Sequence, residues 1–174
     1  EEKKAFISRL YESLCRHDYN IRIDTKDIGY TNLISEFIRQ LADSECIIVV
    51  ISDKYLCSPY CMIELLEIQR NHNIQRRVLP IVYEDVDIGS AGGRMGYLEY
   101  WHGQVEQVNE YIKSTGLLPL LGGQTLRDLE NFRDIENSFD RLLSFILDMN
   151  FRLPSEIEES DFLLLRTRLD EECI

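Results

Sequence analysis

Hydrophobic residues recur along the chain with two different spacings, and each spacing predicts its own kind of element. Residues 2–17 predict an amphipathic helix, because their apolar residues follow the spacing i, i+3, i+4, i+7. These residues are Ile7, Leu10, Tyr11 and Leu14. Residues 46–52 instead form a continuous, β-branched apolar run, as expected of a strand that is buried on both faces of a parallel sheet.

Between these two elements the pattern predicts a short strand, a polar loop and a second helix. The strand covers residues 21–23, and the loop DTKDIGY covers residues 24–30. Thr31 or Asn32 can cap the helix that follows, because either side chain can accept a hydrogen bond from the first helical turn. The apolar face of this helix consists of Ile34, Phe37, Ile38 and Leu41.

Capping residues predict where the next helix begins. Ser58 can act as the N-cap and Pro59 suits the first helical position, so we expect a helix from there to about Arg70. Residues 78–83 predict another buried strand. Short strands and helices that alternate in this way predict a parallel α/β sheet with right-handed crossovers.

The second half of the chain is predicted to be mostly helical. We expect a loop at 85–96 and then a helix at 97–114 around Trp101. An edge strand or packed turn at 117–123 precedes a helix at 125–149. After Pro154 we expect an acidic amphipathic helix at 155–173. The glycine-rich stretch GSAGGRMG lacks the Lys-Ser/Thr ending of a phosphate-binding loop, so a flexible connection is the expectation there.

A sheet of this type normally opens with a central strand before its first helix, whereas this sequence opens directly with the helix. A fold without that strand would leave backbone groups of its neighbours unpaired. We therefore expect the sequence to be an N-terminally incomplete part of a longer chain.

Charge and composition narrow the classes of partner. The chain has 19 Lys and Arg against 31 Asp and Glu, a net charge of -12. A charge of this sign repels nucleic acid phosphates and anionic membranes, so neither is an expected partner. No apolar run reaches the roughly 18 residues that a membrane span needs, and the first residues do not resemble a signal peptide.

The five cysteines give no sign of a disulfide framework or a metal centre. They are Cys15, Cys46, Cys57, Cys61 and Cys173. Their odd number and their places within predicted elements favour a reducing, cytoplasmic setting. Two of them form a C-x3-C pair, but no second pair and no nearby histidine completes a set of metal ligands.

The stretch ISDKYLCSPYCMIELLEI, residues 51–68, resembles the third strand, following loop and third helix of Toll/interleukin-1 receptor (TIR) domains, especially the bacterial ones. In that family a Ser-x-x-Tyr stretch leads into a Trp-Cys-x-x-Glu-Leu signature. The corresponding residues here are Ser52, Asp53, Tyr55, Ser58, Tyr60, Cys61, Glu64 and Leu65. Residues 21–52 resemble the second strand, the BB loop and the second helix, and residues 78–87 resemble the fourth strand.

The resemblance implies a flavodoxin-like α/β TIR fold, a parallel sheet flanked by helices whose first central strand is missing from the sequence. It implies a TIR domain over residues 1–150, N-terminally incomplete, followed at 151–174 by an acidic C-terminal helix or linker towards a further domain. Tyr60 stands where the family has tryptophan, which keeps an aromatic wall but changes its shape. The missing strand helps to line the family's nucleotide pocket, so the site is incomplete in this sequence.

Many bacterial and plant TIR domains cleave NAD+ at the nicotinamide–ribose bond, and the resemblance implies the same activity here. NAD+ is then the substrate, and no metal or other cofactor is required. Hydrolysis of an O-glycoside usually needs an acid for the leaving group, but nicotinamide is already cationic in NAD+. One carboxylate that holds the ribose and stabilises oxocarbenium-like charge can suffice. The resemblance assigns this catalytic role to Glu64.

The predicted fold agrees with this assignment. Glu64 shares a helix face with Tyr60 and Cys61, near the carboxyl end of the strand at 46–52, where open α/β sheets bind ligands. The candidate substrate-binding residues are Ser52, Asp53, Tyr55 and Tyr60. The candidate assembly and lid loop comprises Asp24, Lys26, Asp27, Ile28, Gly29 and Tyr30.

Simpler interpretations stay open for each residue. A glutamate in the first two turns of a helix is favoured by the helix dipole whatever its function, so Glu64 can also be a solvated charge. Tyr55 and Tyr60 can be packing residues, and Cys61 can be a small buried hydrophobe.

The leading functional hypothesis is an NAD+ glycohydrolase effector in a bacterial immune or antiphage system, activated by self-assembly. Its partners would be other TIR copies, as a homo-oligomer or filament, and a fused or associated sensor domain. The alternatives are a non-enzymatic TIR scaffold, which has no chemical need for Glu64 with Ser52 and Asp53, and a flavodoxin-like receiver, which needs an acidic cluster after its first strand.

Overall fold

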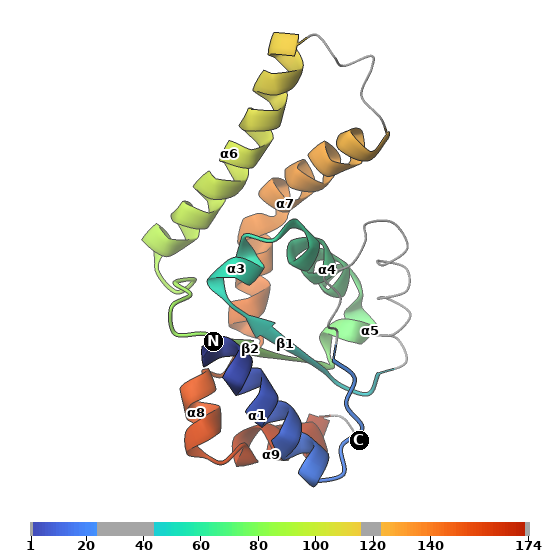
Figure 1. The fold of residues 1–174 in the computed structure, drawn as a ribbon, viewed down its shortest axis with the longest axis vertical. Coiled ribbons are helices and arrows are strands. Elements are labelled where there is room, and N and C mark those ends of the chain that lie inside the picture. Colours follow the sequence, from blue (N-terminus) through green and yellow to red (C-terminus); the bar gives the residue numbers. More distant parts are fainter. Residues whose placement is uncertain (1, 24–43, 116–122, 173–174) are drawn as a thin grey trace.

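The computed structural model describes residues 2–23, 44–115 and 123–172 (Figure 1). Its elements are α1 (Glu2–Arg16), β1 (Ile47–Ile51), α3 (Asp53–Leu56), α4 (Pro59–Arg70), α5 (His72–Gln75), β2 (Val78–Val82), α6 (Ala91–Thr115), α7 (Gly123–Asp148), α8 (Pro154–Glu159) and α9 (Leu163–Glu172). The predicted helix at 31–41, the loop at 24–30 and most of the predicted turn at 117–123 lie outside the described residues.

The two predicted buried strands are confirmed and form a parallel pair. β1 pairs with β2 in a register that runs from Ile47 opposite Val78 to Ile51 opposite Val82. Beyond β2, Arg152 forms a parallel bridge with Ile81. Figure 1 shows the strands in the middle of the molecule, with α3, α4 and α7 on one side and α1, α8 and α9 on the other.

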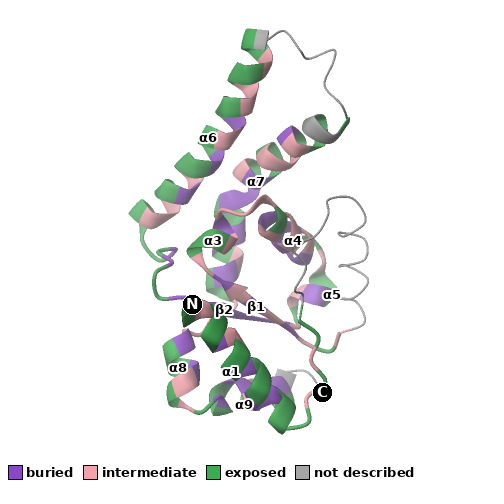
Figure 2. Cartoon of the chain, in the orientation of Figure 1, coloured by how far each residue is buried: buried purple, intermediate pink, exposed green. Residues whose placement is uncertain are grey.

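The core lies on both faces of this pair, and Figure 2 shows it as the buried inner sides of the surrounding helices. The predicted apolar stripe of α7 is confirmed, since most of it is at most 1% exposed. These residues are Ile135, Phe139, Leu142, Leu143 and Ile146. Burial of side chains of this size is the main favourable term in folding, at about 1.5–3 kcal/mol each.

The strand predicted at 21–23 is wrong, because these residues form no strand in the structure. Ile21 packs against the core, whereas Ile23 is 44% exposed. The alternating apolar pattern of these three residues therefore reflects partial burial of one side chain and not pairing with a neighbouring strand.

The glycine-rich loop predicted at 85–96 is also wrong over its second half, because α6 begins at Ala91. Ser90 explains this start: its hydroxyl oxygen accepts a hydrogen bond from the Gly93 amide at 3.0 Å, and its own amide donates to Asp87 Oδ1 at 3.0 Å. These capping interactions offset the low helix propensity of the glycines that follow.

The cysteines differ from expectation at one position. Cys15, Cys57 and Cys61 are free thiols, whereas Cys46 is disulfide-bonded. Sequence spacing does not report the Cα separation of about 4.4–6.8 Å that a disulfide requires, so the pattern gave no warning of this bond.

The single helix predicted over 155–173 is two helices, α8 and α9. Asp161 and Phe162 both adopt left-handed backbone, with φ of 48° and 61°. The Phe162 amide donates to Ile157 O at 2.9 Å and the Asp161 amide donates to Glu158 O at 2.9 Å, a Schellman motif. Ile157 and Phe162 are both buried, and the Phe162 ring lies 6.3 Å from the ring of Phe6 on α1.

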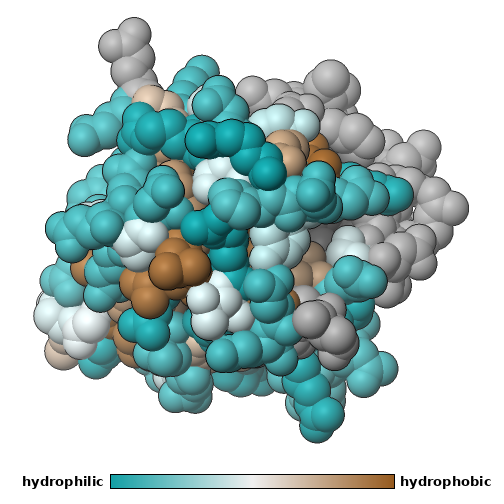
Figure 3. Space-filling model, turned by 90° about the horizontal axis from the view of Figure 1, so that it is seen from below, coloured by the Kyte–Doolittle hydropathy of each residue, from teal (hydrophilic) through white to brown (hydrophobic). Residues whose placement is uncertain are grey.

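Figure 3 views the face that α1, α8 and α9 form, which is mostly hydrophilic with a small apolar area. On α9, Leu163 and Leu164 remain 57% and 47% exposed. Arg9 of α1 donates to Glu158 of α8 through Nε at 2.7 Å. Residues after 150 therefore pack onto the first helix, while a domain boundary near residue 150 stays a prediction.

Asp161→Gly is expected to raise the free energy of unfolding by about 1 kcal/mol. A non-glycine residue at positive φ costs about 1–3 kcal/mol, and glycine removes that cost at a smaller loss of chain entropy. Equilibrium denaturation measures the change. Asp140→Gly is the matched control, because Asp140 is exposed within α7 and glycine in a right-handed helix destabilises. A stability change of the same sign in both variants would contradict the explanation.

A histidine links the two long helices and predicts a pH effect. His102 Nδ1 on α6 lies 2.7 Å from Glu136 Oε1 on α7, and this hydrogen bond raises the pKa of His102. The ion pair stabilises the fold fully at a pH below the ordinary histidine pKa of about 6.5. This contribution is lost as the pH rises through the higher pKa that His102 has in the folded protein.

The melting-temperature difference between the wild type and His102→Gln should therefore shrink between about pH 6.5 and pH 8. His72→Gln serves as the control, because His72 contacts the neutral Gln75 side chain at 3.2 Å. A pH-independent His102→Gln difference would mean that the ion pair adds nothing.

Candidate active site

The candidate site is built on the turn that connects β1 to α4. Ser52 follows β1 with extended backbone and caps α3, because its Oγ accepts a hydrogen bond from the Tyr55 amide at 3.2 Å. Ser58 caps α4 in the same way, through the Cys61 amide, and Pro59 is the first helical residue as predicted. Two consecutive serine caps thus fix the path of the chain from the carboxyl end of β1 into α4.

Glu64 lies half-buried on α4, in the electrostatic neighbourhood of Tyr55 on α3. Burial raises the pKa of Tyr55 well above its usual value, and the nearby Cys61 and Glu64 side chains raise it further. The Tyr55 hydroxyl therefore stays protonated and can donate a hydrogen bond beside the carboxylate. Of the predicted site residues, Tyr55 and Glu64 therefore lie within electrostatic reach of each other, together with Cys61.

Tyr60 occupies the outer part of this region. Its side chain is 41% exposed at the start of α4. Partial burial raises its pKa, and Asp128 of α7 raises it further. Tyr60 therefore lies towards α7 and solvent. The predicted lid residues at 24–30 lie outside the described residues, so the site is described here from its α3 and α4 side.

Asp53, the first residue of α3, is exposed and is held by a residue that the sequence did not single out. The Tyr97 hydroxyl of α6 donates to Asp53 Oδ1 at 2.9 Å. Two neighbours on the same face of α6 bind the α3–α4 turn: Tyr100 donates to Cys57 O at 3.1 Å, and Trp101 Nε1 donates to Leu56 O at 3.0 Å. The helical spacing i, i+3, i+4 predicts one shared face but not these long-range partners.

Trp101 is fully buried and packs within the core. Its ring meets Tyr100 edge-on at a centroid distance of 5.2 Å and contacts Phe132 of α7 at 6.0 Å. Because an indole N–H needs a partner when it is buried, its bond to Leu56 O fixes α3 against α6.

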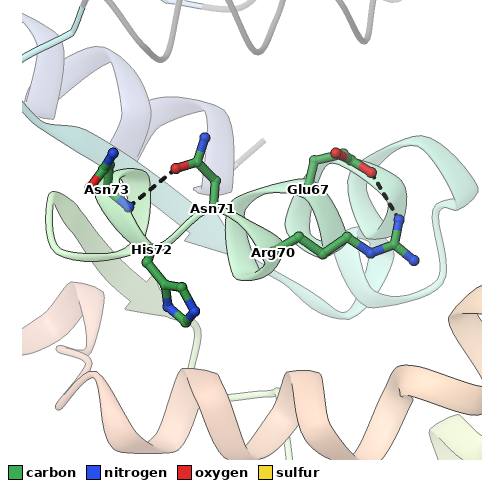
Figure 4. A pocket seen from close by; sticks show the side chains of 5 residues that line it. All are labelled: Glu67, Arg70, Asn71, His72 and Asn73. Atoms are coloured by element: carbon green, nitrogen blue, oxygen red, sulfur yellow. Dashed lines mark hydrogen bonds and ion pairs between the residues drawn. The ribbon is translucent and has the colours of Figure 1, made fainter.

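A separate surface pocket lies at the other end of α4 (Figure 4). It has a volume of about 450 Å³ and is lined by Glu67, Arg70, Asn71, His72 and Asn73. Its polar groups are engaged with each other: Arg70 pairs with Glu67 at 3.0 Å, and the Asn71 side chain caps α5 through the Asn73 amide at 3.1 Å. These bonds give the pocket a structural explanation.

Residues 1–113, more than half of the chain, match the family model of the TIR domain. The chain belongs to the TIR domain family. No curated protein matches it. The match confirms the predicted family and the flavodoxin-like α/β TIR fold, to which the parallel pair β1–β2 and its flanking helices conform.

Membership of the TIR family indicates which activities and partners the site can have. TIR domains interact with other TIR domains, and the family includes enzymes that cleave NAD+. Across the described parts of this TIR domain, no helix is long and apolar enough to cross a membrane. The same residues contain no group of three or more His, Cys, Asp or Glu side chains arranged to hold a metal ion.

Proposed function

We propose that this TIR domain is an NAD+ glycohydrolase of the bacterial type, which releases nicotinamide and leaves ADP-ribose or a cyclised form. The observation that carries the proposal is the half-buried Glu64 on α4, within electrostatic reach of Tyr55 on α3, the short helix that follows the carboxyl end of β1. Open α/β sheets bind ligands at this edge, and family members cleave NAD+.

The proposed chemistry assigns Glu64 to the ribose next to nicotinamide. Its carboxylate accepts hydrogen bonds from ribose hydroxyls and stabilises the positive charge that grows as the C–N bond breaks. The bonding electrons leave with nicotinamide, which becomes neutral and needs no proton from an acid. Water, or a nucleophile of the same substrate molecule, then takes the vacated ribose carbon.

The neighbouring residues serve binding in this proposal. Ser52 uses its oxygen lone pair for the cap of α3, which leaves its hydroxyl hydrogen available for a substrate oxygen. Tyr55 is a second donor in the electrostatic neighbourhood of Glu64, and the partly exposed ring of Tyr60 offers an aromatic face to the substrate. Asp53 adds a carboxylate for a hydroxyl group.

Regulation by assembly completes the proposal. The loop at 24–30 of one copy would complete the pocket of another copy, in a homo-oligomer or filament that a sensor domain triggers in a cytoplasmic antiphage system. The proposal therefore expects low activity for the dispersed domain and high activity for the assembled one.

The test incubates the protein with NAD+ over a range of protein concentrations and follows nicotinamide by chromatography. Light scattering on the same samples reports assembly. Nicotinamide release that rises more steeply than protein concentration supports the proposal. If the assembled protein leaves NAD+ intact, the proposal fails and the function is that of a non-enzymatic TIR scaffold, acting through TIR–TIR interaction.

A further inference from the structure

Three aromatic residues on one face of α6 tie this helix to the candidate site. Tyr97, Tyr100 and Trp101 donate hydrogen bonds to Asp53, Cys57 and Leu56, respectively. We call these three residues the α6 clamp. All three acceptors lie on α3 or at its end, between Ser52, which follows β1, and α4, which carries Glu64.

Two members of the clamp have a structural explanation. Tyr100 and Trp101 bind backbone carbonyls at the end of α3, where the last carbonyl groups of a helix lack intrahelical partners. Satisfying such groups stabilises the turn, whatever the function of the domain.

Tyr97 differs, because its acceptor is the side chain of an exposed residue. Its ring is 9% exposed and lies 6.1 Å from the ring of Phe139 on α7, so it is fixed by packing. Burial, and next the bond to Asp53, raise the pKa of the Tyr97 hydroxyl, which keeps it a donor at any physiological pH. A buried, rigid donor thus sets the orientation of an exposed carboxylate.

The carboxylate of Asp53 has a second oxygen, Oδ2, and no hydrogen bond to it occurs within the described residues. A solvated aspartate loses side-chain freedom when it binds a ligand, which weakens binding. Because Oδ1 is already hydrogen-bonded to Tyr97, the Asp53 side chain loses this freedom when the protein folds and not when a ligand binds. Oδ2 remains available to accept a hydrogen bond from a hydroxyl group.

We propose that Tyr97 is a positioning residue that holds the Asp53 carboxylate for a hydroxyl of the substrate, and thereby sets substrate affinity. This inference rests on the proposed NAD+ glycohydrolase function, in which the substrate is rich in ribose hydroxyls. Tyr97 acts through Asp53 and takes no part in bond breaking, so its loss affects KM and leaves kcat within about twofold.

Tyr97→Phe keeps the ring and removes only the hydroxyl. The variant is expected to raise KM for NAD+ about tenfold in nicotinamide release by assembled protein, the loss that matches one charge-assisted hydrogen bond. Tyr83→Phe is the matched control: Tyr83 is 8% exposed, and its hydroxyl donates to Lys3 O at 3.2 Å, on the α1 side of the sheet. Melting temperatures of both variants report the purely structural effect.

A double-mutant cycle with Asp53→Asn separates positioning from general destabilisation. Tyr97→Phe combined with Asp53→Asn should raise KM no further than Asp53→Asn alone, because Tyr97 acts through that carboxylate. Multiplying effects, or a Tyr97→Phe variant that behaves like Tyr83→Phe, overturn the positioning role while the glycohydrolase function stands. A wild-type assembly that neither cleaves NAD+ nor binds it in calorimetry overturns both.

Discussion

Replacing Glu64 with glutamine is expected to lower the rate of nicotinamide release by assembled protein about 10²- to 10³-fold, the range found when one preorganised group is removed from a charged transition state. Glutamine keeps the size of the side chain and one oxygen that can accept a hydrogen bond from a ribose hydroxyl. It removes the negative charge that opposes the positive ribose, so kcat falls and KM changes little. Steady-state chromatography of nicotinamide, at matched light scattering, measures the effect.

The matched control for this experiment is Glu67→Gln. Glu67 lies one turn further along α4 and pairs with Arg70 at 3.0 Å, on the side of the separate surface pocket. The same chemical change at this position removes an exposed ion pair worth at most about 1 kcal/mol of stability. We therefore expect Glu67→Gln to retain the activity of the wild type.

The two variants together separate the explanations. Loss of activity in Glu64→Gln alone, with assembly intact, assigns the catalytic charge to Glu64. A Glu64→Gln protein that assembles and still cleaves NAD+ rules Glu64 out as the catalytic group. Equal losses in both variants would point to the net charge of α4 rather than to one carboxylate.

The sequence predicted the elements that hold the site, because each carries a strong local signal. β1 and β2 are continuous apolar runs, which suit strands buried on both faces. The start of α4 follows from Ser58 and Pro59, since a cap and a first-position proline are both local requirements. That Glu64 lies near this strand end is predicted from the strand–turn–helix order, and it stays a prediction.

Other features depend on contacts that span the chain or on backbone conformations without a sequence signature. Tyr97 and Asp53 are 44 positions apart, so their hydrogen bond cannot be inferred from spacing. The break between α8 and α9 uses Asp161 and Phe162 at positive φ, where glycine is the usual sign. The sequence did not predict that α6 begins as early as Ala91. The glycines after Ala91 have a low helix propensity, and in a prediction from local sequence this outweighs the capping residue Ser90.

The start of α6 gives the second large expected effect, a loss of stability in Gly93→Ala. A Cβ at this position would lie 1.9 Å from the backbone carbonyl oxygen of Asp87 and 2.5 Å from its Cγ. A carbonyl that belongs to the backbone cannot rotate away, so the turn before α6 must shift. We expect a loss of about 2–3 kcal/mol in the free energy of unfolding, as in other overpacked sites.

Gly96→Ala is the matched control, because the same substitution three residues later meets nothing within 4 Å. Alanine there should stabilise the helix by up to about 1 kcal/mol. Thermal denaturation should therefore show opposite shifts, of about 5–10 °C downward for Gly93→Ala and 2–4 °C upward for Gly96→Ala in a chain of this size. Shifts of the same sign would show that Asp87 does not pack against Gly93 as described.

The Gly93 result also bears on the site, because Tyr97 lies one helical turn after Gly93. Moving the first turn of α6 away from Asp87 displaces Tyr97 relative to Asp53, whose hydrogen bond tolerates only a few tenths of an ångström. Gly93→Ala should therefore raise KM for NAD+ even at temperatures where it is fully folded, whereas Gly96→Ala should not. If Gly93→Ala is destabilised but keeps the KM of the wild type, α3 must shift together with α6, so that the hydrogen bond between Tyr97 and Asp53 is preserved.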